Sequence, residues 1–396
     1  MCRQLHVAIA ATLLSLRPAL VAAQNITCPP TPSPWPEAST FLARSTLPDP
    51  FLYLDGTSRV QTTEEWYACR QREILRMLQQ YQYGEYPDHA AETVTGSRSG
   101  SRLTIQVETD GKSGQFTASL NLPDGASAEA PVPVVMAIGG MDNDAYLAEG
   151  IAVVIVDYTA VSLDSNAKTG AFWSLYNGRD IGTLTAWAWG IHRTLDAIIQ
   201  AVPEIDSTKV GVTGCSRLGK AALAAGLFDQ RITITMPMSS GIQGLGPYRY
   251  TSLSGQGETL ENSKEAAGWW SNSGLGTFVG QSEKLPFDAH TIAAAIAPRA
   301  LIPDEGQSDP FVNAQGTARV VFPAAKLVYD WLEVGEQIGI GIRQGGHCDM
   351  AGFKNILPFV LKVFRGTEPS RDYSDLAPWS AMTEAYPWAA DIPVAA

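Results

Sequence analysis

The sequence predicts an α/β fold, a three-layer αβα sandwich in which helices cover both faces of a doubly wound, mostly parallel sheet. Short apolar runs alternate with helical patterns along most of the chain, which is typical of such a sheet. The runs at 132–138 and 151–158 are almost continuously apolar, as strands covered on both faces require. The alternating segments 103–109 and 115–122 flank Asp110-Gly111-Lys112, and they predict an N-terminal antiparallel hairpin.

The remaining elements follow in chain order. A chain of 396 residues with 45% hydrophobic and 17% charged residues can bury a large core. We expect residues 24–396 to form one domain, with an extended arm at 24–60 and an insertion at 242–285 near the strand ends. Further strands are expected at 210–213, 232–236, 300–302 and 338–342, and helices at 70–83, 182–201, 218–228, 314–332 and 351–364.

Residues 1–23 have the pattern of a secretory signal peptide. Arg3 supplies the positive end, residues 7–16 the short apolar core, and Val21-Ala22-Ala23 the small-residue cleavage site. That core is too short to cross a membrane, and no later stretch is long and apolar enough to do so. We therefore expect a secreted, extracellular protein that begins near Gln24 and carries an N-glycosylation sequon at Asn25.

The chain is acidic, with a formal net charge of −12. This charge disfavours nucleic acids and anionic membranes as partners. Of the 5 cysteines, Cys2 lies in the signal segment, and Cys28, Cys69, Cys215 and Cys348 remain. An even number in an oxidising compartment indicates two disulfides, although these cysteines allow three pairings.

The stretch Gly214-Cys215-Ser216-Arg217-Leu218-Gly219-Lys220 carries the main chemical signal. A short β-branched run leads into it and a small-residue helical run leads out. An α/β-hydrolase presents its nucleophilic serine on such a strand–turn–helix, with the next backbone N–H directed at the oxyanion. The spacing is G-x-S-x-x-G rather than G-x-S-x-G, and the alternative is a turn whose serine only caps the helix. We expect an α/β-hydrolase fold with Ser216 as the nucleophile.

A serine nucleophile needs a base, and His347 is the best placed histidine. It follows the last predicted strand and two glycines and precedes a helix, which gives the order serine, acid, histidine of α/β-hydrolases. For His89, His192 and His290 we expect structural, solvent-exposed or capping roles.

Two cysteines flank these candidates. Cys215 directly precedes Ser216 and Cys348 directly follows His347. If serine and histidine lie within hydrogen-bond reach, their neighbours are close enough for a disulfide. Two buried free thiols are the alternative, which a secreted chain disfavours.

Four motifs along the chain are distinctive in combination. They are the G-C-S-R-L-G-K run, the segment 185–190 (T-A-W-A-W-G), Leu285-Pro286-Phe287-Asp288 and Gly346-His347-Cys348. Together they resemble the fungal glucuronoyl esterases, a family of carbohydrate esterases, over nearly the whole chain after the signal segment. The resemblance implies a serine esterase that cleaves esters between lignin alcohols and (4-O-methyl-)glucuronic acid of glucuronoxylan through an acyl-enzyme. It also implies no metal, no organic cofactor, and the disulfides Cys28–Cys69 and Cys215–Cys348.

The resemblance also implies roles for four further residues. Arg217 resembles the arginine that stabilises the oxyanion, and Lys220 the lysine that donates hydrogen bonds to sugar hydroxyls. Without the family resemblance, Arg217 and Lys220 would be interpreted as solvated residues of the first helical turn. In the insertion, Glu261 and Glu265 have the spacing of the family's uronate-binding glutamine and glutamate, although a solvated helix face explains them equally well.

The sequence departs from the family at the catalytic acid. Ser239 stands where the family has a glutamate, and a serine cannot stabilise an imidazolium as a carboxylate does. Asp309 is the best substitute, because it follows the predicted strand 300–302 in a G-x-x-D-x-x-V pattern; a turn-forming aspartate is the alternative. This pattern favours Asp309 over Asp304 or Glu305. The family's tryptophan after this aspartate is replaced by proline.

The expected protein is therefore a secreted esterase acting on glucuronoxylan and lignin–carbohydrate esters, with Ser216, His347 and Asp309 as its triad. We expect a monomer without nucleic-acid or membrane partners. Two alternatives stay open: a weakly active or inactive carbohydrate-binding relative of an esterase, and an esterase with shifted ester specificity.

Overall fold

The computed structural model describes residues 26–251, 253 and 257–394. The expected signal peptide and the sequon asparagine Asn25 lie outside the described residues. Within these ranges, no helix combines the length and the apolar character needed to cross a bilayer. The strands are β1 (Thr93–Ser99), β2 (Arg102–Thr109), β3 (Lys112–Asn121), β4 (Val132–Ile138), β5 (Ala152–Val156), β6 (Ile205–Cys215), β7 (Ile234–Met238), β8 (Ala300–Leu301), β9 (Asp304–Gly306) and β10 (Gly341–Arg343).

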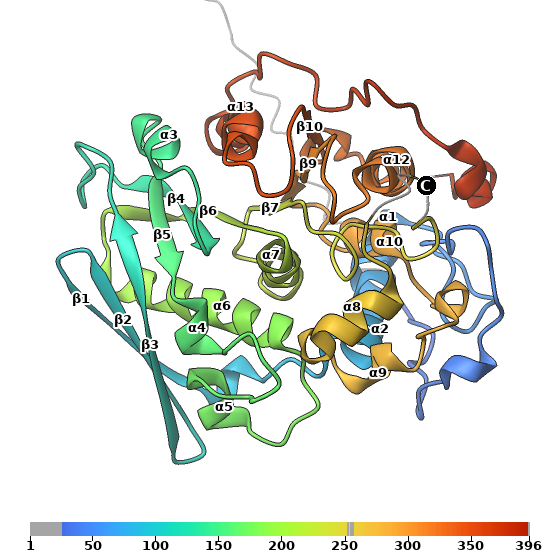
Figure 1. Cartoon of the computed structure of the whole chain (residues 1–396), viewed down its shortest axis with the longest axis horizontal. Coiled ribbons are helices and arrows are strands. Elements are labelled where there is room, and N and C mark those ends of the chain that lie inside the picture. Colours follow the sequence, from blue (N-terminus) through green and yellow to red (C-terminus); the bar gives the residue numbers. More distant parts are fainter. Residues whose placement is uncertain (1–25, 252, 254–256, 395–396) are drawn as a thin grey trace, which may run out of the picture.

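The strands form one mixed sheet, in the order β1-β2-β3-β5-β4-β6-β7-β9-β10, with β8 paired to β7 (Figure 1). Strands β1, β2 and β3 are antiparallel, and β3 joins β5 in antiparallel fashion. The pairs from β5 through β10 are parallel. The helices are α1 (Thr63–Glu65), α2 (Gln71–Leu78), α3 (Asn143–Ala148), α4 (Tyr158–Val161), α5 (Ala171–Tyr176), α6 (Thr183–Ala201), α7 (Arg217–Phe228), α8 (Leu260–Ala267), α9 (Ser273–Gly276), α10 (Ala289–Ala294), α11 (Ala314–Gly316), α12 (Phe322–Trp331) and α13 (Ala351–Arg365).

Two hydrophobic clusters, one on each face of the sheet, make up the core. In β4 the side chains of Val134 and Met136 belong to one cluster, and those of Val135 and Ala137 to the other. Helices α6, α7, α10 and α12 pack into the first cluster, and α3 and α13 into the second. The alternation follows from the two-residue period of a strand, and it confirms the predicted three-layer α/β fold.

The expected hairpin is present as β2 and β3, and the turn at Asp110 and Gly111 has positive φ at both residues, as a tight two-residue turn requires. Strands β1 and β9 were not predicted. Strand β1 is largely exposed and carries little apolar sequence; it is held by pairing with β2 and by the hydrogen bond from Gly96 N–H to Gln200 Oε1 of α6 (2.8 Å). Strand β9 is a three-residue polar segment that only the neighbouring strands identify.

The expected helices at 182–201, 218–228 and 351–364 correspond to α6, α7 and α13. The helix expected at 70–83 is longer and less regular, because π-helical turns precede and follow α2. The pattern at 314–332 is likewise divided by a π-helical turn between α11 and α12.

The arm lies against the body of the protein. A disulfide joins Cys28 to Cys69, with 5.3 Å between their Cα atoms. The Tyr81 hydroxyl donates a hydrogen bond to the Pro36 carbonyl (2.6 Å), and Phe51 of the arm is fully buried. The extended arm therefore contributes side chains to the packed core.

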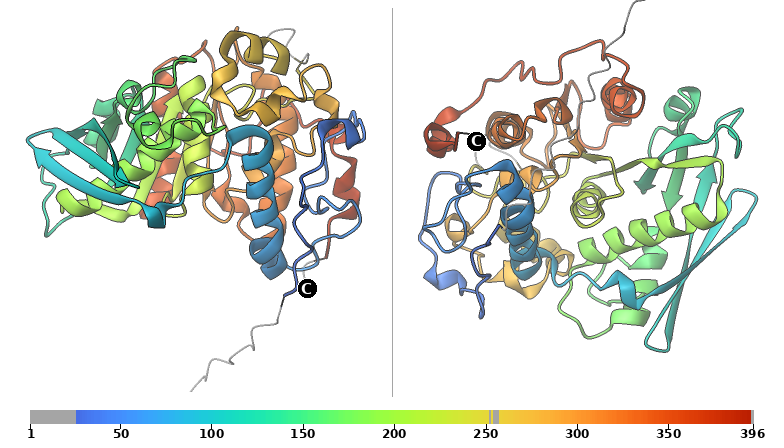
Figure 2. Two further views of the ribbon diagram at one scale, coloured as in Figure 1. Left: turned by 90° about the horizontal axis from the view of Figure 1, so that it is seen from below. Right: turned by 180° about the vertical axis from the view of Figure 1, so that it is seen from behind.

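The insertion contains α8 and α9, which lie together at the upper edge of Figure 2 (left); in Figure 1, α8 lies beside α7 and α9 lies below α8. It is anchored by the hydrogen bond from Asn272 N–H to the Gln82 carbonyl (3.0 Å). The insertion therefore stands next to the helix that follows Ser216.

Candidate active site

Ser216 occupies a sharp turn between β6 and α7. Its φ of 59° and ψ of −129° are unfavourable for a residue with a side chain, as at the strained turn that exposes a nucleophilic serine. Its N–H donates to the Met238 carbonyl of β7 (2.9 Å). A Cβ at Gly214 would lie 2.5 Å from the Leu218 carbonyl oxygen, and one at Gly219 would lie 2.8 Å from that of Met238. The unusual G-x-S-x-x-G spacing therefore accommodates close packing of α7 against β6 at Gly214 and against β7 at Gly219.

Arg217 is the first residue of α7, where a backbone N–H has no acceptor within the helix. The partial positive charge of a helix N-terminus also favours an anion at this point. Its guanidinium Nε lies 2.6 Å from Asp164 Oδ2, and the side chain is 39% exposed. Asp164 Oδ1 also accepts hydrogen bonds from the indoles of Trp269 (2.9 Å) and Trp270 (2.7 Å). This aspartate orients the arginine, and the sequence contained no signal for it.

His347 lies on the loop between β10 and α13, and its Nδ1 is 2.8 Å from Asp309 Oδ2. The other carboxylate oxygen of Asp309 accepts the backbone N–H groups of Phe311 (2.8 Å) and Val312 (3.1 Å). Burial alone would raise the pKa of Asp309, but the hydrogen bonds from His347 and Phe311 outweigh it and hold that pKa below its usual value. The carboxylate is therefore ionised and aimed at the imidazole.

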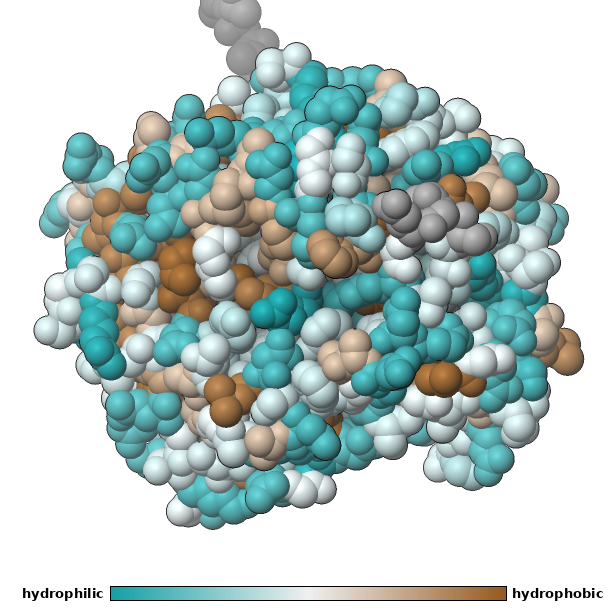
Figure 3. Space-filling view, viewed as in Figure 1, coloured by the Kyte–Doolittle hydropathy of each residue, from teal (hydrophilic) through white to brown (hydrophobic). Residues whose placement is uncertain are grey.

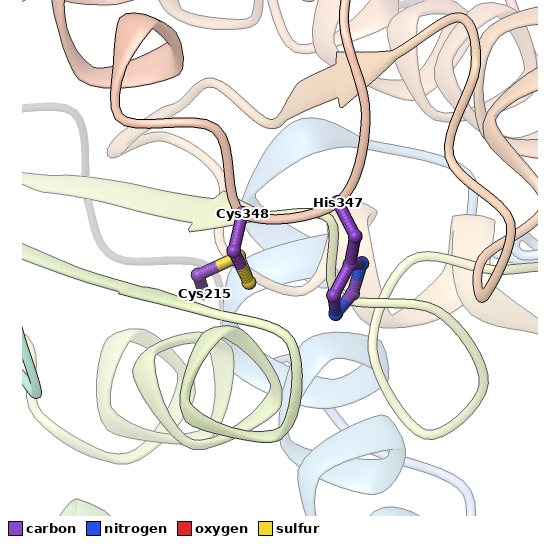
Figure 4. Close-up of side chains that lie close together, drawn as sticks. All are labelled: Cys215, His347 and Cys348. Carbon is purple, nitrogen blue, oxygen red and sulfur yellow. A yellow bond between two sulfur atoms is a disulfide. The ribbon is translucent and has the colours of Figure 1, made fainter.

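The disulfide Cys215–Cys348 links the two halves of this site, with 5.6 Å between its Cα atoms (Figure 4). Both sulfurs and a ring nitrogen of His347 lie within 4.8 Å of one another. Because the sulfurs are bonded to each other, they are not thiolates, and this group is not a metal site as it stands. Among the described residues, Ser216 Oγ has no hydrogen-bond partner. Catalytic hydrogen bonds are often long without substrate, and the disulfide places the loop of His347 against the serine turn.

A buried ion pair holds the histidine loop from behind. Arg343 Nε is 2.6 Å from Asp304 Oδ1, and its Nη1 donates to the Gly346 carbonyl (3.1 Å). Asn355 donates to the other oxygen of Asp304 (2.6 Å). Gly346 immediately precedes His347, so this network fixes the position of the imidazole.

Lys220, one helical turn after Ser216, is fully buried. Its Nζ donates to the Ser240 carbonyl (2.7 Å) and pairs with Glu258 Oε2 (2.6 Å), and it lies 5.4 Å from the centre of the Trp270 ring. Burial lowers the pKa of Lys220, and the charge of Glu258 opposes that change. Lysine, carboxylate and indole form one group beside α7.

Glu261 and Glu265 lie on the exposed face of α8. Glu261 Oε1 accepts the N–H of Gly280 (2.9 Å), so it supports the insertion. Within the described part of the chain, neither glutamate pairs with Lys220; Glu258 does. Sequence reasoning missed Glu258, which had no distinguishing feature beyond being an acid shortly before a predicted helix.

Ser239 directly follows β7 and is fully buried, with a φ of 45° and no partner for its Oγ among the described residues. Its N–H donates to the Asp304 carbonyl (2.9 Å). No carboxylate stands at this position, and the acid that contacts His347 comes from the loop after β9.

The other histidines are distant from this arrangement. His192 Nε2 contacts the Ala225 carbonyl (2.9 Å), and His290 Nε2 the Pro48 carbonyl (2.8 Å). Burial lowers the pKa of each to about 4, so both are neutral near pH 7. His89 lies in a short exposed turn. His89 and His192 match the structural and solvent roles expected, whereas the capping role expected for His290 is wrong, because the side chain of Asp288 caps α10.

Known proteins are similar to this chain in sequence and in fold. The family model described as "Glucuronyl esterase, fungi" matches residues 105–333. The 4-O-methyl-glucuronoyl methylesterase of Podospora anserina is 34% identical over 390 residues, spanning 92% of this chain and 77% of that protein. A carbohydrate esterase family 15 glucuronoyl esterase from Caldicellulosiruptor kristjansonii has a TM-score of 0.82 at 34% identity, covering 89% of this chain and 98% of that one. The glucuronoyl esterase of Sporotrichum thermophile, as a serine-to-alanine mutant with methyl 4-O-methyl-β-D-glucopyranuronate, has a TM-score of 0.76 at 28% identity, covering 90% and 97%.

Proposed function

The chain belongs to the fungal glucuronyl esterase family, and on that premise we propose that Ser216, His347 and Asp309 form the triad of a glucuronoyl esterase. The family's reaction is carboxylic ester hydrolysis. The substrate we propose is an ester of (4-O-methyl-)glucuronic acid on glucuronoxylan, with a lignin alcohol as the leaving group. The observation that carries the triad is the 2.8 Å contact between His347 Nδ1 and Asp309 Oδ2.

In the first half-reaction, Asp309 holds the proton of His347 on Nδ1, which leaves Nε2 free to accept the proton of the serine hydroxyl. Ser216 Oγ attacks the ester carbonyl carbon. The oxyanion is stabilised by the unpaired N–H at the start of α7 and by the guanidinium of Arg217. The tetrahedral intermediate then collapses: the bond to the alcohol oxygen breaks, and His347 gives its proton to that oxygen.

In the second half-reaction, water attacks the acyl-enzyme. His347 accepts a proton from the water, and the same donors stabilise the second oxyanion. The serine leaves with a proton from His347, which releases the uronic acid and restores the enzyme. Apart from the ester and water, every group in these steps belongs to this chain.

The group formed by Lys220, Glu258 and Trp270 is where we place the sugar. Ammonium, carboxylate and indole supply the hydrogen bonds and the apolar face that a sugar ring requires. Because the Lys220 ammonium already has two protein partners, a sugar hydroxyl would join or replace one of them. The exposed positions of Glu261 and Glu265 favour Glu258 for this role.

We further propose that the protein is secreted, glycosylated at Asn25 and monomeric. The support is the signal-like segment 1–23, the sequon, and two disulfides of the kind that persist in oxidising compartments.

The decisive experiment compares the wild type with Ser216→Ala on benzyl glucuronate. We expect kcat to fall by at least about a thousandfold, since the attacking atom is removed. A serine-reactive phosphonate should label the wild type and not the variant. Wild-type polysaccharide binding without turnover or labelling would instead support the inactive carbohydrate-binding relative.

A further inference from the structure

The leaving alcohol must lie beside His347. This statement rests on the proposed function, in which the histidine protonates the alcohol oxygen as the bond to the acyl carbon breaks. The Nδ1 edge of the ring is occupied by Asp309, so the alcohol approaches from the remaining accessible part of the imidazole. Apolar side chains exposed next to that ring are therefore candidates to contact the alcohol.

Phe311 is such a side chain. It is 60% exposed, although burial of an aromatic side chain is strongly favourable. Its ring centre lies 5.0 Å from that of His347, with 65° between the ring planes, an edge-to-face contact. On the face shown in Figure 3, hydrophobic residues gather around a hollow near the centre of the view, where Figure 1 shows α7.

The backbone holds Phe311 in the frame of the site. Its N–H donates to Asp309 Oδ1 (2.8 Å), and its carbonyl accepts the N–H of Glu258 (2.9 Å). One residue thus connects the acid of the proposed triad with the partner of Lys220. These two bonds hold the backbone of Phe311, and its exposed ring lies beside the imidazole.

We propose that Phe311 contacts the alcohol half of the ester and favours alcohols that carry an aromatic ring. A fixed phenyl ring beside the leaving oxygen can make edge or offset contacts with a benzylic alcohol, at the usual separation of aromatic pairs. A methyl alcohol is too small to form them. The contact therefore raises kcat/KM for aryl esters and leaves methyl esters unaffected.

The test uses methyl glucuronate and benzyl glucuronate, which have the same sugar and differ only in the alcohol. For Phe311→Ala, we expect kcat/KM on the benzyl ester to fall about tenfold, as loss of an aromatic contact of ordinary strength implies. The methyl ester should change less than about twofold. Phe311→Leu, which keeps apolar bulk, should retain part of the benzyl preference.

Ile199→Ala is the matched control, because Ile199 is a 51% exposed apolar residue on α6, away from this loop. It should leave both esters unchanged. Thermal unfolding of each variant shows whether the fold is intact, and the exposed ring makes a folding defect unexpected.

Equal losses on both esters would overturn the inference, because Phe311 would then act on the sugar or on the imidazole. An unchanged benzyl-to-methyl ratio in both Phe311 variants would overturn it too. If the losses are equal, the pH profile of kcat/KM distinguishes the two explanations. A Phe311 ring that acts on the imidazole would change the pH at which activity appears, and a ring that contacts the sugar would not. Failure of the wild type on both esters would refute the proposed function itself, and this inference with it.

Discussion

The serine turn and the acid–histidine loops are held in place differently. Ser216 is positioned mainly by its neighbours in the sequence, the end of β6 and the start of α7, with one backbone hydrogen bond to Met238 of β7. His347 and Asp309 lie on separate loops, after β10 and after β9, and they meet only because the two strands pair. A nucleophile can be encoded locally, whereas an acid–base pair depends on contacts between distant parts of the chain.

This difference bears on the acid that we propose for the triad. At the end of β7, Ser239 has no carboxylate, yet the imidazole still has an ionised partner from the loop beyond β9. The requirement is a carboxylate within hydrogen-bond distance of Nδ1, and Asp309 on the loop after β9 meets it. The serine turn is built by β6 and α7, which adjoin it in the sequence, and by the Met238 carbonyl of β7, which accepts the Ser216 N–H.

The largest effect on the acid–histidine region is expected from Asp309→Asn. The amide cannot hold the proton of His347 on Nδ1 or stabilise the imidazolium, so kcat should fall by about ten-thousandfold while the fold persists. Steady-state kinetics on benzyl glucuronate measure this. Asp330→Asn is the control, because the ion pair of Asp330 within the described residues is with Lys326, one helical turn away at the surface. Near-normal turnover in Asp309→Asn would refute the relocated acid.

The same variant has a pH signature. The folded-state pKa of Asp309 is depressed, so the carboxylate stabilises the fold above its unfolded pKa and loses that contribution as pH falls through the folded value. The difference in unfolding free energy between wild type and variant should therefore shrink in acid. A difference that is independent of pH would contradict the depressed pKa.

A smaller effect is expected from Arg343→Ala, which removes the support behind His347. It leaves Asp304 buried without its charge partner, and the unfolding free energy should drop by about 3 kcal/mol in urea titrations. Burial already raises the pKa of Asp304. Without the arginine, the loss of unfolding free energy relative to the wild type should therefore grow as pH rises and the carboxyl loses its proton. Turnover should fall as well, since the loop of Gly346 is released.

Arg365→Ala is the matched control for that prediction. Arg365 faces Glu149 at the surface, and such an exposed pair contributes less than about 1 kcal/mol. An equal loss of stability in both variants would mean that the buried pair has no special role.

The smallest effect is expected when the losses of unfolding free energy on removing each of the two disulfides are compared. Cys215–Cys348 closes 133 residues and Cys28–Cys69 closes 41. In the chain-entropy model, the double serine variant of the longer loop loses about 1 kcal/mol more unfolding free energy than that of the shorter one. Only the Cys215–Cys348 variant should also lower kcat, because that bridge joins the serine turn to the histidine loop. Equal kinetic effects would show that the bridge does not position the site.

The sequence alone determined the features that depend on neighbours along the chain. Hydrophobic periodicity predicted the alternation of strands and helices, and glycines around Ser216 predicted the turn. The order of serine, acid and histidine led to His347 and Asp309, which the structure brings into contact. Periodicity and local turn chemistry act over a few residues, so they can be recognised without knowing the fold.

The tertiary structure alone decided the partners that come from elsewhere in the chain. Asp164 beside Arg217, Glu258 beside Lys220 and Phe311 beside His347 had no local pattern, and Glu261 and Glu265 had a spacing that led away from Lys220. The edge strand β1 was missed for the same reason, since pairing with β2 and not its own sequence makes it a strand. Such contacts form when the sheet and the insertion pack together, and residue spacing along the chain does not specify them.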